Sequence, residues 1–105
     1  MRILLDECVH KRVAWGLRSH EVQTVQQAGW GGLKNGNLLH AASVRFDVFI
    51  TSDKNLEYQQ HTGTLPLPVI TIYTKGNMWE DIEPVIPKLQ ALLSAPLTIK
   101  FYRVE

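Results

Sequence analysis

Short apolar segments alternate with helix-periodic segments along the chain. The segments that predict strands are residues 2–5, 20–25, 48–51, 69–73 and 98–104. The segment 48–51 is apolar in character from end to end, which is typical of a strand buried on both faces. Strands that alternate with helices are typical of parallel βαβ units. The pattern therefore predicts an α/β fold.

Helical segments are expected between these strands. Residues 7–17 carry apolar side chains at every fourth position, which predicts an amphipathic helix. A second helix should begin at Asn35 or Asn37, because either side chain can cap its first turn. A helical turn is expected at residues 55–60, and a loop at residues 62–68.

The apolar face over residues 82–93 predicts a last helix that contains Pro84 and Pro87. Proline removes a helical hydrogen bond and clashes with the preceding turn, so a kink or two helical pieces are expected there. The strand that follows, 98–104, should lie at an edge of the sheet.

The chain has 105 residues, which is enough for one domain with one core. Right-handed crossovers and the reversal of strand order at a switch point favour the order 2-1-3-4-5. We therefore expect residues 1–105 to form a single three-layer, Rossmann-like domain. It should have a mostly parallel central sheet of about five strands, with helices on both faces.

Composition narrows the class of protein. Apolar residues make up 45% and the formal net charge is +1, which argues against a surface that coats a polyanion. The four histidines show no zinc-type spacing. The chain has one cysteine, Cys8, and neither a signal peptide nor a membrane-spanning apolar segment, so a cytoplasmic protein without membrane contact is expected. Cys8 itself is expected to be a small buried residue.

Two aspartates carry the candidate chemistry. Asp6 and Asp53 come at the ends of the first and third predicted strands. Ligands of open α/β sheets bind beyond the carboxyl ends of the strands, so the two carboxylates should converge at one crevice. Neighbouring strands lie about 4.8 Å apart, so these charges would repel each other unless a cation separates them. Magnesium suits such a site, and Glu7 could add a direct or water-mediated contact.

Other residues could complete this site. Lys54 could contact a phosphate, and Asn55 could do so or cap the short helix. Tyr58 could line a groove, and Trp30, which lies among three glycines, could form a binding lip. Each also has an ordinary interpretation. An aspartate after a strand is commonly a helix cap, a lysine is commonly a solvated charge, and Trp30 is more often packed against the edge of the sheet.

Three short motifs resemble a known family. They are Leu4-Leu5-Asp6-Glu7, Gly32-Leu33-Lys34-Asn35 and Thr51-Ser52-Asp53-Lys54-Asn55-Leu56. In these motifs, and over nearly its whole length, the chain resembles the PIN-like proteins of the DUF5615 type. Those proteins are generally taken for toxin components of bacterial toxin–antitoxin systems, and they are related to PIN-domain ribonucleases that use magnesium or manganese.

The resemblance implies a PIN-like domain that hydrolyses phosphodiester bonds in single-stranded RNA. Asp6 and Asp53, with help from Glu7, would hold Mg²⁺ or Mn²⁺, Thr51 would orient the site, and Lys54 would stabilise charge on the phosphate. Further residues expected to contact the RNA are Ser52, Asn35, Asn55, Trp30 and Tyr58. The implied partner is a small cognate antitoxin protein, and a homodimer is left open.

One part of the family pattern differs in this chain. PIN domains place a further acidic residue near the start of the central helices, where this chain has Asn35 and Asn37. An amide oxygen can bind magnesium but carries no charge. Weaker metal binding is therefore expected unless a substrate completes the site.

Two other classes of function stay open. A receiver-type phosphoacceptor domain also carries acids after its first and third strands, but it needs a lysine at the end of its last strand. Here the last predicted strand offers only Lys100, in its middle. A catalytically silent binding module would keep the pseudo-site and work through a partner, and the amides at Asn35 and Asn37 favour that alternative.

Overall fold

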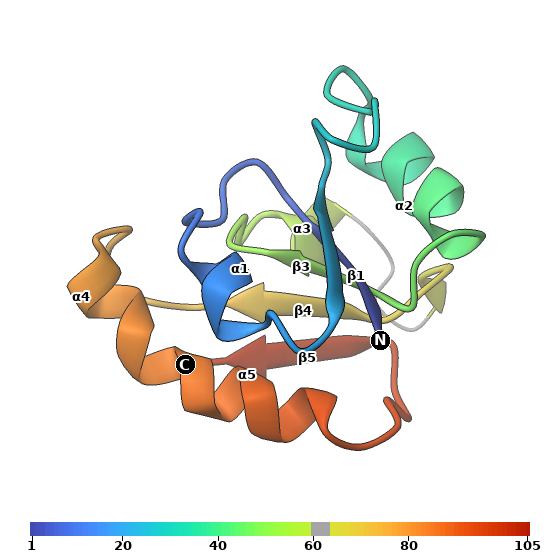
Figure 1. Ribbon diagram of the computed structural model, residues 1–105. Helices are drawn as coiled ribbons and strands as arrows, with labels where there is room; N and C mark the ends of the chain where they lie inside the picture. Colours follow the sequence, from blue (N-terminus) through green and yellow to red (C-terminus); the bar gives the residue numbers. More distant parts are fainter. Residues whose placement is uncertain (60–63) are drawn as a thin grey trace.

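The computed structural model of the chain describes residues 1–59 and 64–105. Within these residues the strands form one sheet, in which every neighbouring pair is parallel. The strands are β1 (Arg2–Leu5), β2 (Glu21–Thr24), β3 (Val48–Thr51), β4 (Val69–Ile72) and β5 (Phe101–Val104). Their order is β2-β1-β3-β4-β5, which confirms the predicted order and the α/β class (Figure 1).

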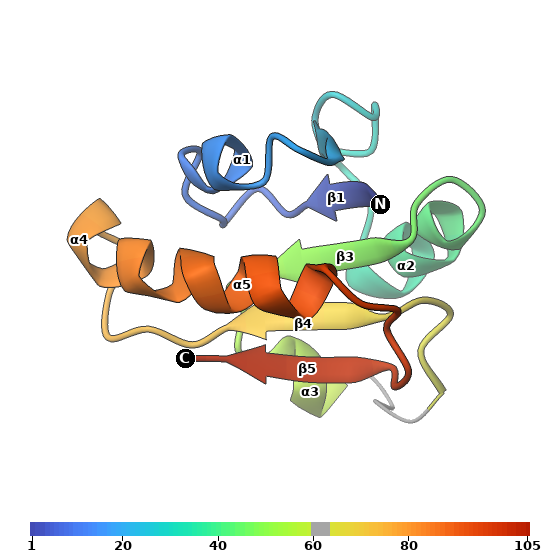
Figure 2. The same ribbon diagram turned by 60° about the horizontal axis from the view of Figure 1, so that its bottom comes forward.

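Helices cover both faces of the sheet. They are α1 (Val13–Gly16), α2 (Asn35–Ser43), α3 (Leu56–Gln59), α4 (Trp79–Ile82), the 3-10 helix η2 (Glu83–Val85) and α5 (Ile86–Leu93). The helices α1, α4 and α5 pack on one face, and α2 and α3 pack on the other (Figure 2). No helix in the described part of the chain is long and apolar enough to cross a membrane.

Alternate side chains of each strand enter the two cores. On β3, Val48 and Ile50 join the core beneath α1, α4 and α5, whereas Phe49 joins the core beneath α2 and α3. All the residues of β3 are buried, as expected for a strand covered on both faces. A slip of one residue would exchange the two sets of side chains, so burial holds the register of β3 and the position of the segment that follows it.

The helix expected over residues 7–17 is shorter than predicted. Only Val13–Gly16 is α-helical. The N–H groups of Val9 and Val13 donate to carbonyls three residues back, at 3.1 and 3.0 Å, as in turns. The Asp6 side chain accepts the N–H of the next residue at 2.9 Å, which stabilises a turn in place of the first turn of a helix.

The prediction that an asparagine caps α2 was wrong. The N-cap is Lys34, which makes no side-chain cap hydrogen bond, and Asn35 is the first residue of the helix. The Lys34 carbonyl accepts the N–H of Leu38 at 2.8 Å. The helix is therefore started by its backbone and by the burial of its apolar face.

The last helical segment is divided at its prolines, as predicted. Pro84 lies in η2 and Pro87 lies at the start of α5. The helical turn expected at residues 55–60 is α3, which the structure describes as Leu56–Gln59. Its expected last residue, and the first part of the loop expected at 62–68, lie outside the described residues.

The last strand lies at an edge of the sheet, as expected, but it begins at Phe101 and not at residue 98. The hydroxyl oxygen of Tyr102 accepts the N–H groups of Thr98 and Ile99, at 2.8 and 3.1 Å. Those amides are thereby withdrawn from the strand ladder, which explains the later start.

Candidate functional site

The parallel register lines up side chains in rows at the carboxyl edge of the sheet. On the face covered by α2 and α3, one row is apolar and consists of Leu4, Phe49, Val69 and Phe101. Two positions further along each strand, side chains return to the same face. These residues, which we call the polar row, are Asp6, Thr51, Thr71 and Arg103. The apolar layer thus ends where α/β sheets bind ligands.

Thr51 connects the two halves of the candidate site. Its side chain is fully buried, and its hydroxyl donates to Asp6 Oδ2 at 2.7 Å. The hydroxyl oxygen of Thr51 also accepts the backbone N–H of Asp53, at 3.0 Å. The segments that follow β1 and β3 are therefore joined through one buried atom, which brings Asp6 and Asp53 to the same part of the sheet edge.

Both aspartates are half-buried, and each accepts a hydrogen bond from the adjacent backbone. Asp6 Oδ1 accepts the N–H of Glu7, and Asp53 Oδ1 accepts the N–H of Asn55, each at 2.9 Å. Aspartates commonly have this turn-capping role. Since a carboxylate offers about four lone-pair positions, capping a turn and binding a cation are compatible.

The described residues include no cluster of three or more histidine, cysteine, aspartate or glutamate side chains that could hold a metal ion. Thr51 Oγ1 lies 2.7 Å from Asp6 Oδ2 and 3.0 Å from the backbone nitrogen of Asp53, so the segments that carry the two carboxylates are adjacent. Magnesium is commonly held by one or two carboxylates together with water and a substrate phosphate. The two carboxylates are therefore ligands of the type that suits a hard cation whose coordination is completed by a substrate.

Cys8 is exposed, so the prediction that it is buried was wrong. Its Sγ lies 3.4 Å from Asp6 Oδ2 and 3.4 Å from Thr51 Oγ1. Its carbonyl accepts the hydroxyl of Ser52 at 2.9 Å. Cys8 lies in the turn that replaces the expected helix start, and this turn carries its side chain to the rim of the site. Ser52 ties that turn to the segment after β3.

Glu7 and its neighbour Asp6 have different surroundings. A Cβ atom placed on Gly31 would lie 3.2 Å from Glu7 Oε1, so this carboxylate lies beside the glycine-containing loop. The Asp6 carboxylate is instead turned toward Thr51. Both acids line a hollow of about 440 Å³ between β1, β2 and α1, to which Lys11 also contributes. The two acids therefore share one hollow but have different neighbours.

Two cations meet at the other end of the polar row, over the ring of Tyr73. The guanidinium carbon of Arg103 lies 3.8 Å from the ring centroid, and Lys54 Nζ lies 5.6 Å from it. Lys54 Nζ also donates to the carbonyl of Thr74 at 3.1 Å. The ammonium group expected to contact a phosphate is therefore held by the segment that follows β4, and Arg103 contacts the same ring.

The hydroxyl of Tyr73 donates to the carboxylate of Glu57 on α3. Partial burial, followed by this hydrogen bond and the negative charge of Glu57, raises the pKa of Tyr73 to about 12. Sequence reasoning missed Tyr73, Glu57 and Arg103. The alternation of side chains along β4 and β5 was the available signal, since it places Tyr73 and Arg103 on the same face as Thr71.

The remaining predicted residues lie in different surroundings. Trp30 packs edge-on against Phe46, with ring centroids 5.9 Å apart, and the Arg45 guanidinium lies 4.9 Å above its ring. The sequence favoured packing of Trp30 against the edge of the sheet, and its observed partner is Phe46, which lies between α2 and β3. Tyr58 is 82% exposed on α3. Asn55 is exposed just before α3, and Asn35 begins α2.

No protein-family model matches the chain, and neither does any curated protein or solved structure. Evidence for a function therefore comes from the fold and from the arrangement of side chains at the carboxyl edge of the sheet.

Proposed function

We propose that the chain is a metal-dependent endoribonuclease that cleaves single-stranded RNA, with Mg²⁺ or Mn²⁺ held by Asp6 and Asp53. The observation that supports it most is the buried hydroxyl of Thr51, which hydrogen-bonds the side chain of Asp6 and the backbone of Asp53. Because the sheet fixes this atom, both aspartates are positioned before a ligand arrives.

When bound, the metal would polarise a phosphoryl oxygen and lower the pKa of a water molecule that attacks the phosphorus in line. The residues of the chain position the groups and neutralise charge. Thr51 orients the Asp6 carboxylate. Lys54 and Arg103 place two positive charges at the β4–β5 end of the same edge, where they can stabilise a phosphate.

The family resemblance extends the proposal to a partner. A toxin-like nuclease must be held inactive, and an arginine or lysine of an antitoxin can do this by lying between Asp6 and Asp53 in place of the metal. Such a charge-assisted hydrogen bond contributes about 1.5 to 3 kcal/mol. Millimolar manganese should then weaken binding of the antitoxin to the wild-type protein but not to Asp53→Asn.

Metal binding is tested by calorimetric titration with manganese. We expect binding by the wild-type protein and its loss in Asp53→Asn, because the removed charge is one of the two that hold the cation. Glu21→Gln is the matched control, since Glu21 is an exposed carboxylate at the amino end of β2 and should not affect binding. Equal binding by the wild type and the Asp6→Asn, Asp53→Asn double variant would exclude the site.

Catalysis is tested by incubating the purified protein and manganese with unstructured RNA. Slow cleavage is expected, because the chain lacks the further acid of PIN domains. Chelation or Asp6→Ala should abolish it. Glu21→Gln should cleave at the wild-type rate. Cleavage that persists in Asp6→Ala would come from a contaminating nuclease, and that result would leave the proposal without support.

A catalytically silent binding module is the second candidate. It is favoured by Asn35, an amide at the start of α2, and by the lack of a three-member acidic cluster in the described residues. Manganese binding without cleavage of any RNA would favour this candidate. A receiver-type domain fits less well, because Lys100 precedes β5 and that strand ends in Arg103 and Val104.

A further inference from the structure

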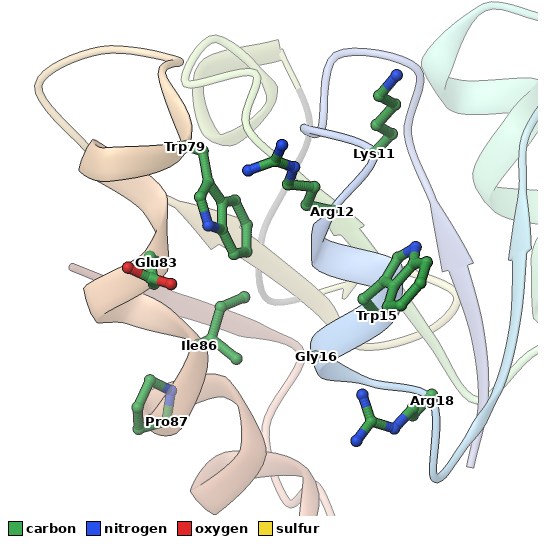
Figure 3. Close-up of a pocket in the computed structure, with 9 residues that line it drawn as sticks. All are labelled: Lys11, Arg12, Trp15, Gly16, Arg18, Trp79, Glu83, Ile86 and Pro87. Atoms are coloured by element: carbon green, nitrogen blue, oxygen red, sulfur yellow. The ribbon is translucent and has the colours of Figure 1, made fainter.

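A second hollow lies between α1 and the α4–α5 segment, on the face opposite α2 and α3 (Figure 3). Its volume is about 640 Å³. We call it the basic-aromatic groove, because its lining includes Trp15, Trp79, Lys11, Arg12, Arg18 and Glu83. Trp79 enters from the α4 side, and Trp15 and the three cations come from α1 and its flanking turns (Figure 3).

The floor of the groove is formed by a close contact between two helices. A Cβ atom on Gly16 would lie 2.6 Å from Ile86 Cγ2, which is too close for any side chain. Glycine therefore allows α1 to lie directly against α5. Gly16, Ile86 and Pro87 supply the apolar part of the lining where the two helices meet.

The indoles are available to a ligand in different degrees. Trp15 is 73% exposed, although it is one of the largest apolar side chains in the protein. Trp79 is half-buried, with the His10 ring 5.4 Å and the Arg12 guanidinium 5.9 Å from its ring. Exposed aromatic rings that alternate with cations are typical of surfaces that stack unpaired bases and contact phosphates.

The charge of the groove is complementary to a polyanion. The lining contains three cations, Lys11, Arg12 and Arg18, and one carboxylate, that of Glu83, in a chain whose net charge is only +1. A single nucleic acid strand presents flat rings and negative charges in alternation, whereas an acidic peptide matches the charge alone. The lining therefore favours single-stranded nucleic acid as the occupant.

We propose that the basic-aromatic groove binds single-stranded RNA, with a base stacked on Trp15 and phosphates on Lys11, Arg12 and Arg18. This inference deepens the proposed function, on which it rests for the identity of the ligand. Lys11 lines both this groove and the hollow that contains Asp6. A strand held in the groove can therefore continue along Lys11 toward the carboxylates, which makes the groove a holding site remote from the bond that is cleaved.

The test measures binding without turnover. The protein is added to a fluorescein-labelled single-stranded oligouridylate at low salt, in the presence of a chelator. Binding is followed by the fluorescence anisotropy of the label. We expect Trp15→Ala to weaken binding at least about fivefold, because one stacked base is lost, and Trp15→Phe to retain most of the affinity. Trp15 is largely exposed, so neither variant should unfold the protein.

The cations are tested by the salt dependence of the same titration. The double variant Arg12→Gln, Arg18→Gln should reduce the slope of log affinity against log salt by about 1.4, because each lost contact to a single strand contributes about 0.7. Arg45→Gln is the matched control, since Arg45 is an exposed arginine that does not line the groove. It should lower affinity less than the double variant does.

The outcomes separate this inference from the proposed function. RNA binding that depends on Trp15, without cleavage under any metal condition, supports RNA binding by the groove and excludes the proposed nuclease activity. Cleavage by the wild type with unchanged RNA affinity in Trp15→Ala overturns the groove alone. Tight binding of an oligoglutamate peptide with no binding of the oligouridylate also overturns it, because the groove would then accept an acidic protein segment.

Discussion

Thr51 and Thr71 allow a paired test of how the candidate site is built. They are register partners on adjacent strands, both belong to the polar row, and both are essentially fully buried. The hydroxyl of Thr51 has hydrogen-bond partners, as described above. The hydroxyl of Thr71 has no hydrogen-bond partner within the described residues. Replacing each residue with valine nearly keeps the shape of the side chain and exchanges the hydroxyl for a methyl group.

The two substitutions should change stability in opposite directions. Thr51→Val removes a hydrogen bond of 2.7 Å to a carboxylate and leaves the N–H of Asp53 without its acceptor. A hydrogen bond to a charged group contributes about 1.5 to 3 kcal/mol. Asp6 is half-buried, so water can replace part of the lost hydrogen bond. We therefore expect a loss of about 1 to 2 kcal/mol in the free energy of unfolding. Thr71→Val relieves a buried, unpaired hydroxyl and should stabilise the protein by about 1 kcal/mol.

Urea denaturation of the metal-free proteins measures both changes. For a domain of this size, 1 kcal/mol corresponds to a shift in Tm of about 4 to 8 °C, so thermal melts give a second measurement. The comparison is internal, because the two valines occupy equivalent positions. Equal shifts in both variants, or a stabilised Thr51→Val, would refute the view that the hydroxyl of Thr51 organises the site.

Two further predictions concern packing and pH. Gly16→Ala should lower the free energy of unfolding by about 1 to 3 kcal/mol, because its Cβ would lie 2.6 Å from Ile86 Cγ2. In the same denaturation experiment Gly32→Ala, which meets nothing within 4 Å, should change it by less than about 0.5 kcal/mol. The pKa of Tyr73 is raised from 10.0 to about 12 in the folded state, so its contribution to stability is complete below pH 10.0 and is lost as the pH rises toward about 12. Tyr73→Phe should reduce this alkaline loss of stability, and an unchanged loss in alkaline denaturation would contradict the assigned environment of Tyr73.

Several features of the fold could be predicted from local sequence pattern. The strands, their order and the division of the last helix at Pro84 and Pro87 follow from short-range periodicity and from general rules of connection. The position of Asp6 at the end of β1 and the burial of β3 follow in the same way. Local pattern and the general rules of chain connection were therefore enough to predict these properties.

The errors at Cys8 and at residues 7–12 have a different origin. The apolar spacing that predicted a helix was correct about burial, since Val9 and Val13 are both in the core. It was wrong about the backbone, because the Asp6 side chain accepts the N–H of the next residue and the segment forms turns. Periodicity reports which side chains are buried, and it does not distinguish a helix from successive turns with the same spacing.

The amino-acid pattern was enough to predict that two carboxylates come at the ends of neighbouring parallel strands. The arrangement of their neighbours appears only in three dimensions: Thr51 joins Asp6 to the segment of Asp53, Glu7 lies beside Gly31, and Arg103 contacts the ring of Tyr73. The hydrogen bond between Thr51 and Asp6 spans 45 positions of the chain. Such contacts form because burial on both faces of the sheet fixes the register between distant strands, and no pattern within a single strand contains that information.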